Sequence, residues 1–195
     1  MVKRIEICGG IAAGKTSLTR ILEEEGFSTA VYERFSDNPF LSDFYVANEV
    51  DNTFETEIVF VLIHYNLLKE TRDKKTLVCD YSLLQDYCYG VNNLQQCEIE
   101  TFRHLYDYVI RQISKPDFII YLKCNVDCLL ERIKKRGRDM EMNISKEYLQ
   151  SNIDVLEKHL CNMKNVLVIE SDKYNFITKD KDMIVKKIRD YCIDK

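Results

Sequence analysis

The sequence predicts an α/β fold in which helices cover both faces of a parallel β-sheet. Five apolar runs are short, rich in β-branched residues and free of polar alternation, which is typical of strands buried on both faces. Longer stretches with helical spacing lie between these runs, and such an alternation indicates right-handed βαβ crossovers. Together these observations predict a doubly wound sheet, in which ligands bind at the carboxyl ends of the strands.

The strands and helices are expected to alternate along the chain. The apolar runs predict strands at 4–8, 28–33, 76–80, 118–124 and 166–171. The helical spacing predicts helices at 17–25, 57–72, 99–114, 126–136 and 146–162. In the second helix, Ile58, Val61 and Leu68 share one stripe, which should therefore face the core.

The composition fits one domain that spans residues 1–195. The chain is 46% hydrophobic and 31% charged, which is enough apolar material for a single core. Two prolines, six glycines and the absence of repeats give no sign of a linker. A second full domain is therefore not expected.

Charge and hydropathy restrict the partners and the compartment. The formal net charge of −4 provides no global attraction to nucleic acid or to an anionic membrane. The chain begins without the apolar core of a signal peptide and has no apolar span of 18 residues, so a cytoplasmic protein is expected. Its eight cysteines form no CxxC pair or zinc pattern and are expected to be reduced thiols in the core.

A glycine-rich segment between the first strand and the first helix predicts a phosphate-binding loop. It matches GxxxxGK[ST] and comprises Gly9, Gly10, Ile11, Ala12, Ala13, Gly14, Lys15 and Thr16, with Ser17 directly after it. Glycines let consecutive backbone N–H groups approach phosphate oxygens, and the helix dipole adds positive potential. Lys15 would reach the β and γ phosphates and Thr16 would bind magnesium. The alternative is a glycine turn with an exposed lysine.

Other nucleotide-binding classes fit less well. The GTPase signatures NKxD and DxxG are absent from their expected places, and the chain is too short for the additional modules of most motor ATPases. A small-molecule kinase remains, and its acceptor site should lie near the phosphate-binding loop.

Glu33 is the candidate for a general base. It ends the second predicted strand, at the sheet edge that carries the phosphate-binding loop. Transfer to a hydroxyl group requires a nearby carboxylate that accepts the proton. A solvated acid at the end of a strand is the alternative interpretation.

Several motifs appear in the order found in deoxyribonucleoside kinases. These are the phosphate-binding loop, the glutamate followed by DNPFL, the segments TFETE and CDYSLLQD, and the arginine-rich LLERIKKRGRDME. The chain resembles that family from residue 3 to about 176. The resemblance implies a P-loop kinase fold with a five-stranded parallel sheet, flanking helices and an arginine-rich lid. It also implies ATP as phosphoryl donor, Mg²⁺, a deoxynucleoside acceptor and a homodimer.

The resemblance also implies roles for single residues. Glu33 matches the base that accepts the 5′-hydroxyl proton, and Tyr45 and Glu141 match residues that hold the sugar 3′-hydroxyl. As an alternative, Tyr45 is simply a packed aromatic residue. The segment 170–176, ESDKYNF, resembles the loop that contacts the adenine of ATP.

Arg132, Arg136 and Arg138 resemble the arginines of a lid at about 132–142. Guanidinium groups stabilise the charge that spreads over the phosphoryl oxygens during transfer. Arg132 and Arg136 fall on one helical face, and Gly137 then loosens the chain before Arg138. A basic, solvent-facing end of a helix is the alternative.

The sequence departs from the family after the third strand. Many relatives have an acid-Arg-Ser triplet there, whereas this chain has Asp80-Tyr81-Ser82. Asp80 can still organise magnesium with Thr16, but Tyr81 supplies no permanent positive charge. Arg34, beside Glu33, is a speculative substitute for the missing arginine.

The predicted nucleobase pocket also departs from the family. Glu57 stands where many relatives have a glutamine, His64 replaces an arginine, and Asp86 matches an acidic residue. An ionised carboxylate only accepts hydrogen bonds, which favours the two adjacent donors of guanine and hence a purine. If Glu57 and Asp86 raise one another's pKa, a protonated form would suit adenine, and cytosine also remains open. A satisfied helix histidine and a helix-start acid are the structural alternatives.

The favoured function is therefore ATP-dependent phosphorylation of the 5′-hydroxyl of a deoxyribonucleoside in nucleotide salvage. A nucleoside monophosphate kinase similar to thymidylate kinase is the enzymatic alternative, but its acceptor would need an additional basic anchor. A nucleotide-binding protein without transfer activity is the alternative from another class, because of Tyr81 and the unusual pocket.

Overall fold

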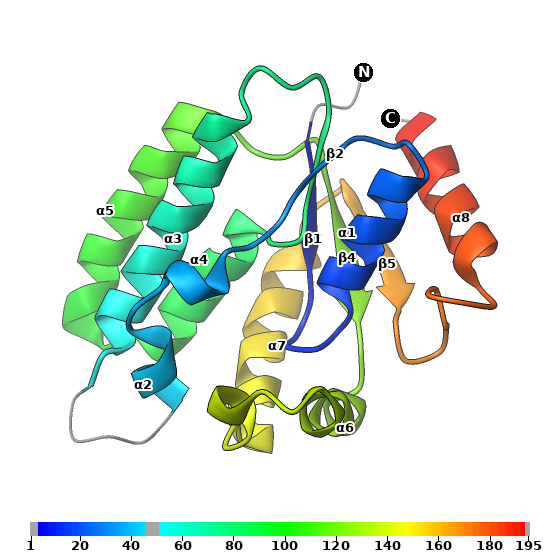
Figure 1. Cartoon of the computed structure of the whole chain (residues 1–195). Coiled ribbons are helices and arrows are strands. Elements are labelled where there is room, and N and C mark those ends of the chain that lie inside the picture. The colour runs from blue at the N-terminus through cyan, green and yellow to red at the C-terminus, as the bar shows by residue number, and fades with distance from the viewer. Residues whose placement is uncertain (1–3, 46–50, 194–195) are drawn as a thin grey trace.

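Five parallel strands form the central sheet of the computed structural model, which describes residues 4–45 and 51–193 (Figure 1). Their order across the sheet is β2-β3-β1-β4-β5. The strands are β1 (Arg4–Cys8), β2 (Thr29–Val31), β3 (Leu77–Cys79), β4 (Phe118–Lys123) and β5 (Val166–Glu170). Every neighbouring pair is parallel, so the predicted α/β sheet is confirmed, with strand ends that differ by up to two residues.

Helices connect the strands and cover the sheet. They are α1 (Lys15–Glu24), α2 (Leu41–Tyr45), α3 (Thr53–Glu70), α4 (Leu83–Asn93), α5 (Gln96–Ile113), α6 (Val126–Arg136), α7 (Lys146–Leu160) and α8 (Lys181–Ile193). Two 3₁₀ turns, η1 (Phe35–Asp37) and η2 (Asp139–Glu141), follow β2 and α6. Five of these helices were expected from the spacing. The spacing did not predict α2, α4 and α8, and α4 contributes Gln85, Asp86 and Tyr89 to the cavity described below.

The two faces of the sheet pack against different sets of helices, although α7 contributes buried residues to both of the core clusters that contain residues of β4. Ile120 and Leu122 of β4 belong to a core cluster that contains buried residues of α1 and α8. Ile119 and Tyr121, which alternate with them, pack in a second cluster with α4 and α7. Successive strand residues point to opposite faces, so this segregation is that of a doubly wound sheet. Figure 1 shows α3 and α5 side by side at one end, outside α4.

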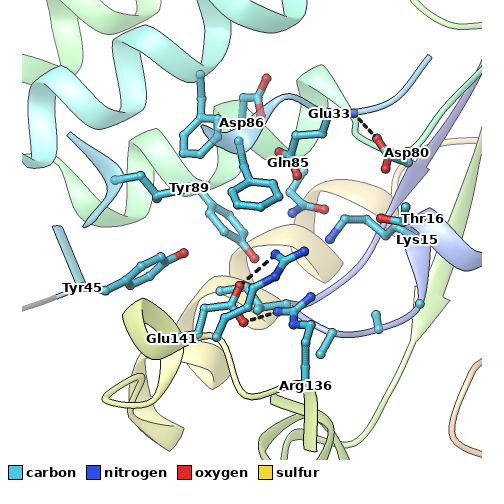
Figure 2. A pocket seen from close by; sticks show the side chains of 18 of the residues that line it. Lys15, Thr16, Glu33, Tyr45, Asp80, Gln85, Asp86, Tyr89, Arg136 and Glu141 are labelled. Carbon is cyan, nitrogen blue, oxygen red and sulfur yellow. Dashed lines mark hydrogen bonds and ion pairs between the residues drawn. The ribbon is translucent and has the colours of Figure 1, made fainter. Parts of the chain in front are cut away.

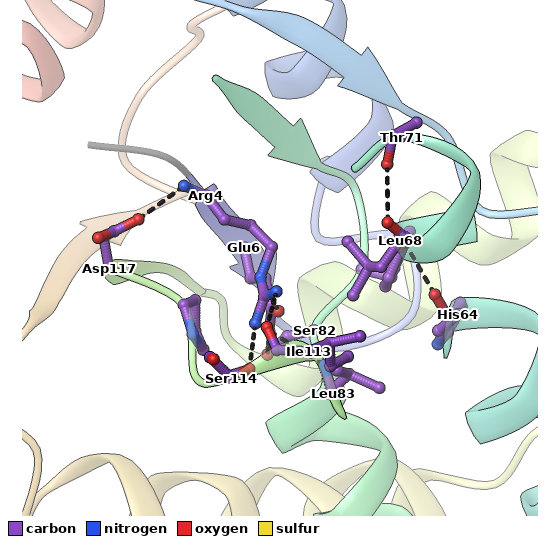
Figure 3. Close-up of polar contacts among 12 residues, drawn as sticks. Arg4, Glu6, His64, Leu68, Thr71, Ser82, Leu83, Ile113, Ser114 and Asp117 are labelled. Atoms are coloured by element: carbon purple, nitrogen blue, oxygen red, sulfur yellow. Dashed lines mark hydrogen bonds and ion pairs between the residues drawn. The ribbon is translucent and has the colours of Figure 1, made fainter. Parts of the chain in front are cut away.

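A buried ion pair ties α4 to the central strand (Figure 3). Glu6 of β1 is fully buried, and its Oε1 lies 3.0 Å from Nε of Arg4. Its Oε2 accepts hydrogen bonds from Ser82 Oγ at 3.0 Å and from the backbone N–H of Leu83 at 3.1 Å. The Arg4 guanidinium also donates to the carbonyl oxygen of Ser114, directly after α5. These contacts fix the first turn of α4 against the sheet.

The cysteine prediction is correct in part. All eight cysteines are free thiols, and Cys8, Cys79, Cys88 and Cys124 are buried. The expectation of core positions is wrong for Cys97 and Cys161, whose side chains are exposed, because they lie on the outer surface at the start of α5 and just after α7. Among the residues that the structure describes, there is no cluster of three metal-binding side chains, and none of the helices could cross a bilayer.

Candidate active site

One cavity of about 420 Å³ opens at the carboxyl ends of β1, β2 and β3. Its wall contains the phosphate-binding loop, the residues after β2, the inner faces of α3 and α4, and the segment from α6 to η2. Figure 2 shows Lys15 and Thr16 on one side of this cavity and Tyr45 on the opposite side. The position agrees with the rule that ligands bind at the carboxyl edge of a parallel sheet.

The phosphate-binding loop forms a tight backbone turn between β1 and α1. The N–H of Ala13 donates to the carbonyl oxygen of Gly10 at 3.0 Å, and Gly14 has a φ of 104°. A Cβ at Gly9, whose φ is 149°, would lie 2.7 Å from the carbonyl oxygen of Leu122, so only glycine fits there. The close approach of β4 therefore requires this glycine.

The residues from Ile11 to Ser17 line the cavity, whereas Gly9 and Gly10 lie behind it. The Lys15 ammonium donates to the carbonyl oxygens of Gly9 at 3.0 Å and Gly10 at 3.4 Å. The lysine thus folds over its own loop and brings positive charge to the N-terminal end of α1. This arrangement can bind an anion such as a phosphate group.

Glu33 and Asp80 lie together at the ends of β2 and β3. The backbone N–H of Glu33 donates to Oδ1 of Asp80, as Figure 2 shows. Asp80 also accepts a hydrogen bond from Thr16. Burial raises the pKa of Asp80, while the hydrogen bonds from Glu33 and Thr16 oppose that effect. Asp80 therefore contacts both Glu33, the candidate base, and Thr16, the other predicted magnesium ligand.

The carboxylate of Glu33 is partly buried in the cavity wall, where it faces His64. Its Oε1 lies 3.3 Å from Nε2 of His64, whose other ring nitrogen, Nδ1, lies 2.7 Å from Oδ2 of Asp86. Burial opposes ionisation of Glu33, but the positive charges of His64, Lys15 and Arg138 outweigh it and lower the pKa of Glu33. Burial raises the pKa of Asp86, against the lowering effect of His64.

The structure does not bring Tyr81 or His64 into the lining of the cavity. The Tyr81 ring is 2% exposed and stacks on the His64 ring, with centroids 3.9 Å apart and planes 8° apart. The Tyr81 hydroxyl donates to the carbonyl oxygen of His64 at 3.4 Å. Arg34 lies outside the cavity too, because it is exposed and pairs with Glu70 on α3. Residues 34 and 81 therefore supply no positive charge to this cavity, so Arg34 does not substitute for the missing arginine.

The far end of the cavity is lined by Glu57 of α3 and Asp86 of α4. Burial, helped by the nearby charge of Asp86 and opposed by a hydrogen bond from Asn93, raises the pKa of Glu57 to about 8. That bond runs from Nδ2 of Asn93 to Oε1 of Glu57 at 2.7 Å. Glu57 therefore titrates close to neutral pH, where it can accept hydrogen bonds or, when protonated, also donate one.

Tyr45 and Glu141 both line the cavity, although 96 positions of sequence separate them on α2 and η2. Tyr45 packs edge-on against Phe44, with centroids 5.1 Å apart, and against Tyr148, with centroids 6.4 Å apart. Glu141 is buried and pairs with two arginines, Arg136 and Arg138. The structure thus brings together the two residues that were expected near a sugar hydroxyl.

The three predicted lid arginines have different surroundings. Arg132 donates to the carbonyl oxygen of Ser171 at 2.6 Å and to that of Ala13 at 3.3 Å. Arg136 and Arg138 instead bind Glu141, at the other side of the cavity. All three line the cavity, so each has access to a bound anion, but they do not form one cluster.

A second cavity of about 590 Å³ adjoins the phosphate-binding loop. Its wall includes Gly14, Ser17 and Arg132 together with the segment 171–177. This segment contains most of the predicted adenine loop at 170–176. The second cavity and the first share the phosphate-binding loop and Arg132.

Sequence reasoning missed several residues of the cavity wall. Gln85, Tyr89 and Tyr148 line it, and Asn93 binds Glu57. Gln85 also accepts a hydrogen bond from the N–H of Gly9 at 2.9 Å, so it supports the phosphate-binding loop. The signal was available, because residues 82, 85, 86, 89 and 93 repeat at three- and four-residue intervals along one helical face.

Comparisons with known proteins agree with this geometry. The family model described as deoxynucleoside kinase matches residues 5–193. Deoxyguanosine kinase of Bacillus subtilis (strain 168) is 30% identical over 189 residues, which cover 91% of each chain. Deoxyadenosine kinase of Lactobacillus acidophilus is 28% identical and covers 91% of this chain and 90% of its own.

A solved structure of deoxyadenosine kinase from M. mycoides, with the products dCMP and dCDP bound, superposes with a TM-score of 0.81. The two sequences are 23% identical, and the match covers 96% of this chain and 99% of the other. The superposition therefore establishes the same fold.

Proposed function

The chain belongs to the deoxynucleoside kinase family, and from this premise we propose that it transfers the γ-phosphoryl group of ATP to the 5′-hydroxyl of a deoxyribonucleoside. The relatives are phosphotransferases, which supports the reaction class. The observation that carries the finer proposal is the position of Glu33. Its carboxylate shares one cavity with the phosphate-binding loop, and the acceptor side of that cavity is rich in carboxylates.

Glu33 is proposed to accept the proton of the 5′-hydroxyl. A base must be ionised before the reaction, and the lowered pKa of Glu33 supports an ionised carboxylate at neutral pH. The acceptor oxygen would lie between this carboxylate and the phosphate-binding loop. In-line displacement then needs little covalent chemistry from the protein, which mainly positions the reactants and stabilises charge.

The phosphate-binding loop and the lid arginines are proposed to stabilise the transferring group. Lys15 and the N–H groups of the loop would bind the β and γ phosphates, where they stabilise the charge of the transition state. Arg132 lies between the two cavities, so it can contact the donor. Arg136, at the end of α6, and Arg138, directly before η2, would approach the γ-phosphoryl group from the other side.

The residues present fit a magnesium ion. Thr16 and Asp80 provide a hydroxyl and a carboxylate in mutual contact, and hard cations such as Mg²⁺ prefer oxygen ligands. Magnesium usually binds one or two carboxylates together with substrate phosphates and water, so two protein ligands suffice. When bound, the ion would neutralise charge on the β and γ phosphates.

Binding positions can also be proposed for the adenine of ATP and for the deoxyribose of the acceptor. We infer that the ATP adenine lies in the second cavity, against the segment 171–177, because that cavity continues from the phosphate-binding loop. Tyr45 and Glu141 are proposed to hold the 3′-hydroxyl of the deoxyribose. The tight packing of Tyr45 against Tyr148 supports a pocket that is closed around a small sugar.

The proposed substrates are purine deoxynucleosides. Glu57 offers guanine two acceptors when ionised, and it offers adenine a donor and an acceptor when protonated. The relatives include both a deoxyguanosine kinase and a deoxyadenosine kinase, which supports a purine without selecting between the two.

The choice between the two purines is expected to depend on pH. Because the pKa of Glu57 is raised to about 8, the fraction of ionised carboxylate grows as the pH rises toward that value. The ratio of ionised to protonated Glu57 changes tenfold per pH unit, so the ratio of kcat/KM for deoxyguanosine to that for deoxyadenosine should rise about 100-fold between about pH 6.5 and pH 8.5. Steady-state kinetics with both nucleosides across this range measures the ratio.

Glu57→Gln is the matched variant for this experiment. Its amide has nearly the same shape and does not titrate, so the ratio should become independent of pH and favour deoxyadenosine. A ratio that keeps its full pH dependence in Glu57→Gln would assign the effect to another group.

A panel of acceptors tests the proposed reaction itself. The four natural deoxynucleosides, with ATP and magnesium, are compared with dGMP, dTMP and AMP, and the products are separated by chromatography. We expect phosphorylation of purine deoxynucleosides. A monophosphate acceptor would bring a second anion to a cavity already lined by Glu33, Glu57 and Asp86. Turnover of monophosphates alone would overturn the proposal.

We further infer a cytoplasmic homodimer that acts in nucleotide salvage. Leu62 of α3 and Tyr108 of α5 are 43% and 50% exposed on neighbouring helices, which supports an apolar contact surface. Light scattering should give twice the 23.1 kDa mass of one chain. Leu62→Lys together with Tyr108→Lys should shift the mass toward the monomer, whereas an unchanged dimer would place the interface elsewhere.

A further inference from the structure

His64 occupies an unusual position between two carboxylates of the cavity wall. Its Nδ1 forms a hydrogen bond with Asp86 of α4 at 2.7 Å, whereas its buried Nε2 lies 3.3 Å from Glu33 after β2, within ion-pair distance but without hydrogen-bond geometry. Both carboxylates line the cavity, but His64 is 1% exposed and lies behind them. The three groups come from separate elements, so the imidazole is the physical link between them.

The positions of the two carboxylates determine the protonation of the ring. A neutral imidazole carries one N–H, so one of its nitrogens would direct a lone pair at a carboxylate oxygen. A buried repulsion of this kind is costly, whereas a ring protonated on both nitrogens offers a donor to each carboxylate. Burial lowers the pKa of His64, but the charge and hydrogen bond of Asp86, together with the charge of Glu33, outweigh it and raise the pKa to about 10.

Aromatic packing prevents the ring from turning away. Tyr81 stacks on it with centroids 3.9 Å apart and planes 8° apart, and Phe60 lies 5.9 Å away. The Tyr81 hydroxyl donates a hydrogen bond to the backbone carbonyl oxygen of His64, which also holds the Tyr81 ring in place. A cation on an aromatic face is favourable, which agrees with a charged ring. The ring therefore has no surface that could stack on a nucleobase.

Other charges also act on the group formed by Glu33, His64 and Asp86. Glu33 also experiences the positive charges of Lys15 and Arg138, but His64 contributes the largest effect that lowers its pKa. Through its other ring nitrogen, His64 also lowers the pKa of Asp86, against the raising effect of burial. Removing the ring would leave two partly buried carboxylates on one wall without their common partner.

We propose that His64 is a positioning residue, whose doubly protonated ring holds the carboxylates of Glu33 and Asp86 in the orientation that proton transfer and nucleoside binding require. The expected effect on kcat rests on the proposed function. The charge and position of the ring do not, because they can be measured without a substrate.

NMR of the free protein tests the charge. Long-range ¹H–¹⁵N spectra distinguish a ring with two N–H groups from either neutral tautomer, and the His64 signals are assigned by their loss in His64→Gln. We expect both nitrogens of His64 to stay protonated up to at least about pH 8. A ring with a single proton at about pH 7 would overturn the proposal, whatever the enzyme phosphorylates.

A double-mutant cycle tests the positioning role. His64→Gln should lower kcat about 100-fold, because a small displacement of a catalytic group is enough for such a loss. In a Glu33→Gln background the same change should lower kcat by less than about 3-fold, because the group to be positioned is already inactive. Equal losses in both backgrounds would mean that His64 only supports the fold, and the proposal would fail.

His104→Gln is the matched control for this cycle. His104 is exposed on α5, outside the cavity lining, so its replacement should leave kcat unchanged in both backgrounds. If the wild-type protein phosphorylates no deoxynucleoside, the proposed function fails, and the NMR experiment still decides the state of His64. If His64→Gln does not fold, the His64 signals are assigned by elimination with His104→Gln and His159→Gln, and the wild-type spectrum then decides the charge.

Discussion

Lys15→Ala is expected to reduce phosphoryl transfer by about 1,000-fold or more. Lys15 supplies a positive charge in the phosphate-binding loop, where its ammonium group donates to the carbonyl oxygens of Gly9 and Gly10. The charge on the phosphoryl oxygens grows toward the transition state, so a donor in a partly enclosed site acts mainly on kcat. Single-turnover assays with a purine deoxynucleoside and ATP measure the loss directly.

Two further variants separate charge from folding. Lys15→Met keeps most of the aliphatic side chain, so an equal loss in both Lys15 variants would assign the effect to the ammonium group. Lys186→Ala removes an exposed lysine of α8 that pairs with Asp190, and it should change neither turnover nor melting temperature measurably. Transfer within about 10-fold of wild type in Lys15→Ala would contradict the role of the loop.

Local sequence patterns were sufficient for the sheet and the phosphate-binding loop. The strand β1, the glycine turn and α1 follow one another within 21 residues, so their relation is fixed by chain connectivity. The proximity of Glu33 and Asp80 could also be expected, because the strands that precede them are parallel and their carboxyl ends meet at one edge. The contact from the Glu33 backbone to Asp80 agrees with that reasoning.

The wall formed by α4 was harder to foresee. Its sequence, LLQDYCYGVNN, contains glycine, asparagine and aromatic residues, which have modest or poor helix propensity. Tertiary contacts compensate for this. Glu6 accepts hydrogen bonds at its start, and Gly90 allows such close contact with Phe102 that an added Cβ would lie 2.2 Å from the ring. Neither contact can be inferred from the local pattern, so the helix was not predicted, and the three- and four-residue spacing of Tyr89 and Asn93 was not recognised as one helical face.

The roles of His64 and of the lid arginines depended on distant partners. The sequence suggested that His64 meets the nucleobase or is a satisfied histidine of the helix, and the structure places it behind two carboxylates. Arg132 and Arg136 share a helical face, yet one binds near Ser171 and the other binds Glu141. Long side chains reach different partners from one face, which helical spacing alone cannot predict.

Glu33→Gln is expected to lower kcat by roughly 100- to 10,000-fold, while the Kd for the nucleoside changes by no more than about 3-fold. The amide has nearly the shape of the carboxylate and can still accept a hydrogen bond from His64, but it cannot take up the proton of the 5′-hydroxyl. Steady-state turnover gives kcat, and calorimetry without ATP gives the Kd. An effect on kcat alone identifies a group that acts in the transition state.

Glu70→Gln provides a matched control, because Glu70 is an exposed glutamate whose partner, Arg34, is the neighbour of Glu33. It should keep both kcat and affinity, since exposed ion pairs contribute little. If Glu33→Gln instead weakened nucleoside binding as much as it lowered kcat/KM, Glu33 would hold the substrate without acting as the base. Near-normal turnover in Glu33→Gln would require another proton acceptor, and Asp80, whose Oδ1 already accepts the backbone N–H of residue 33, would be the next carboxylate to replace.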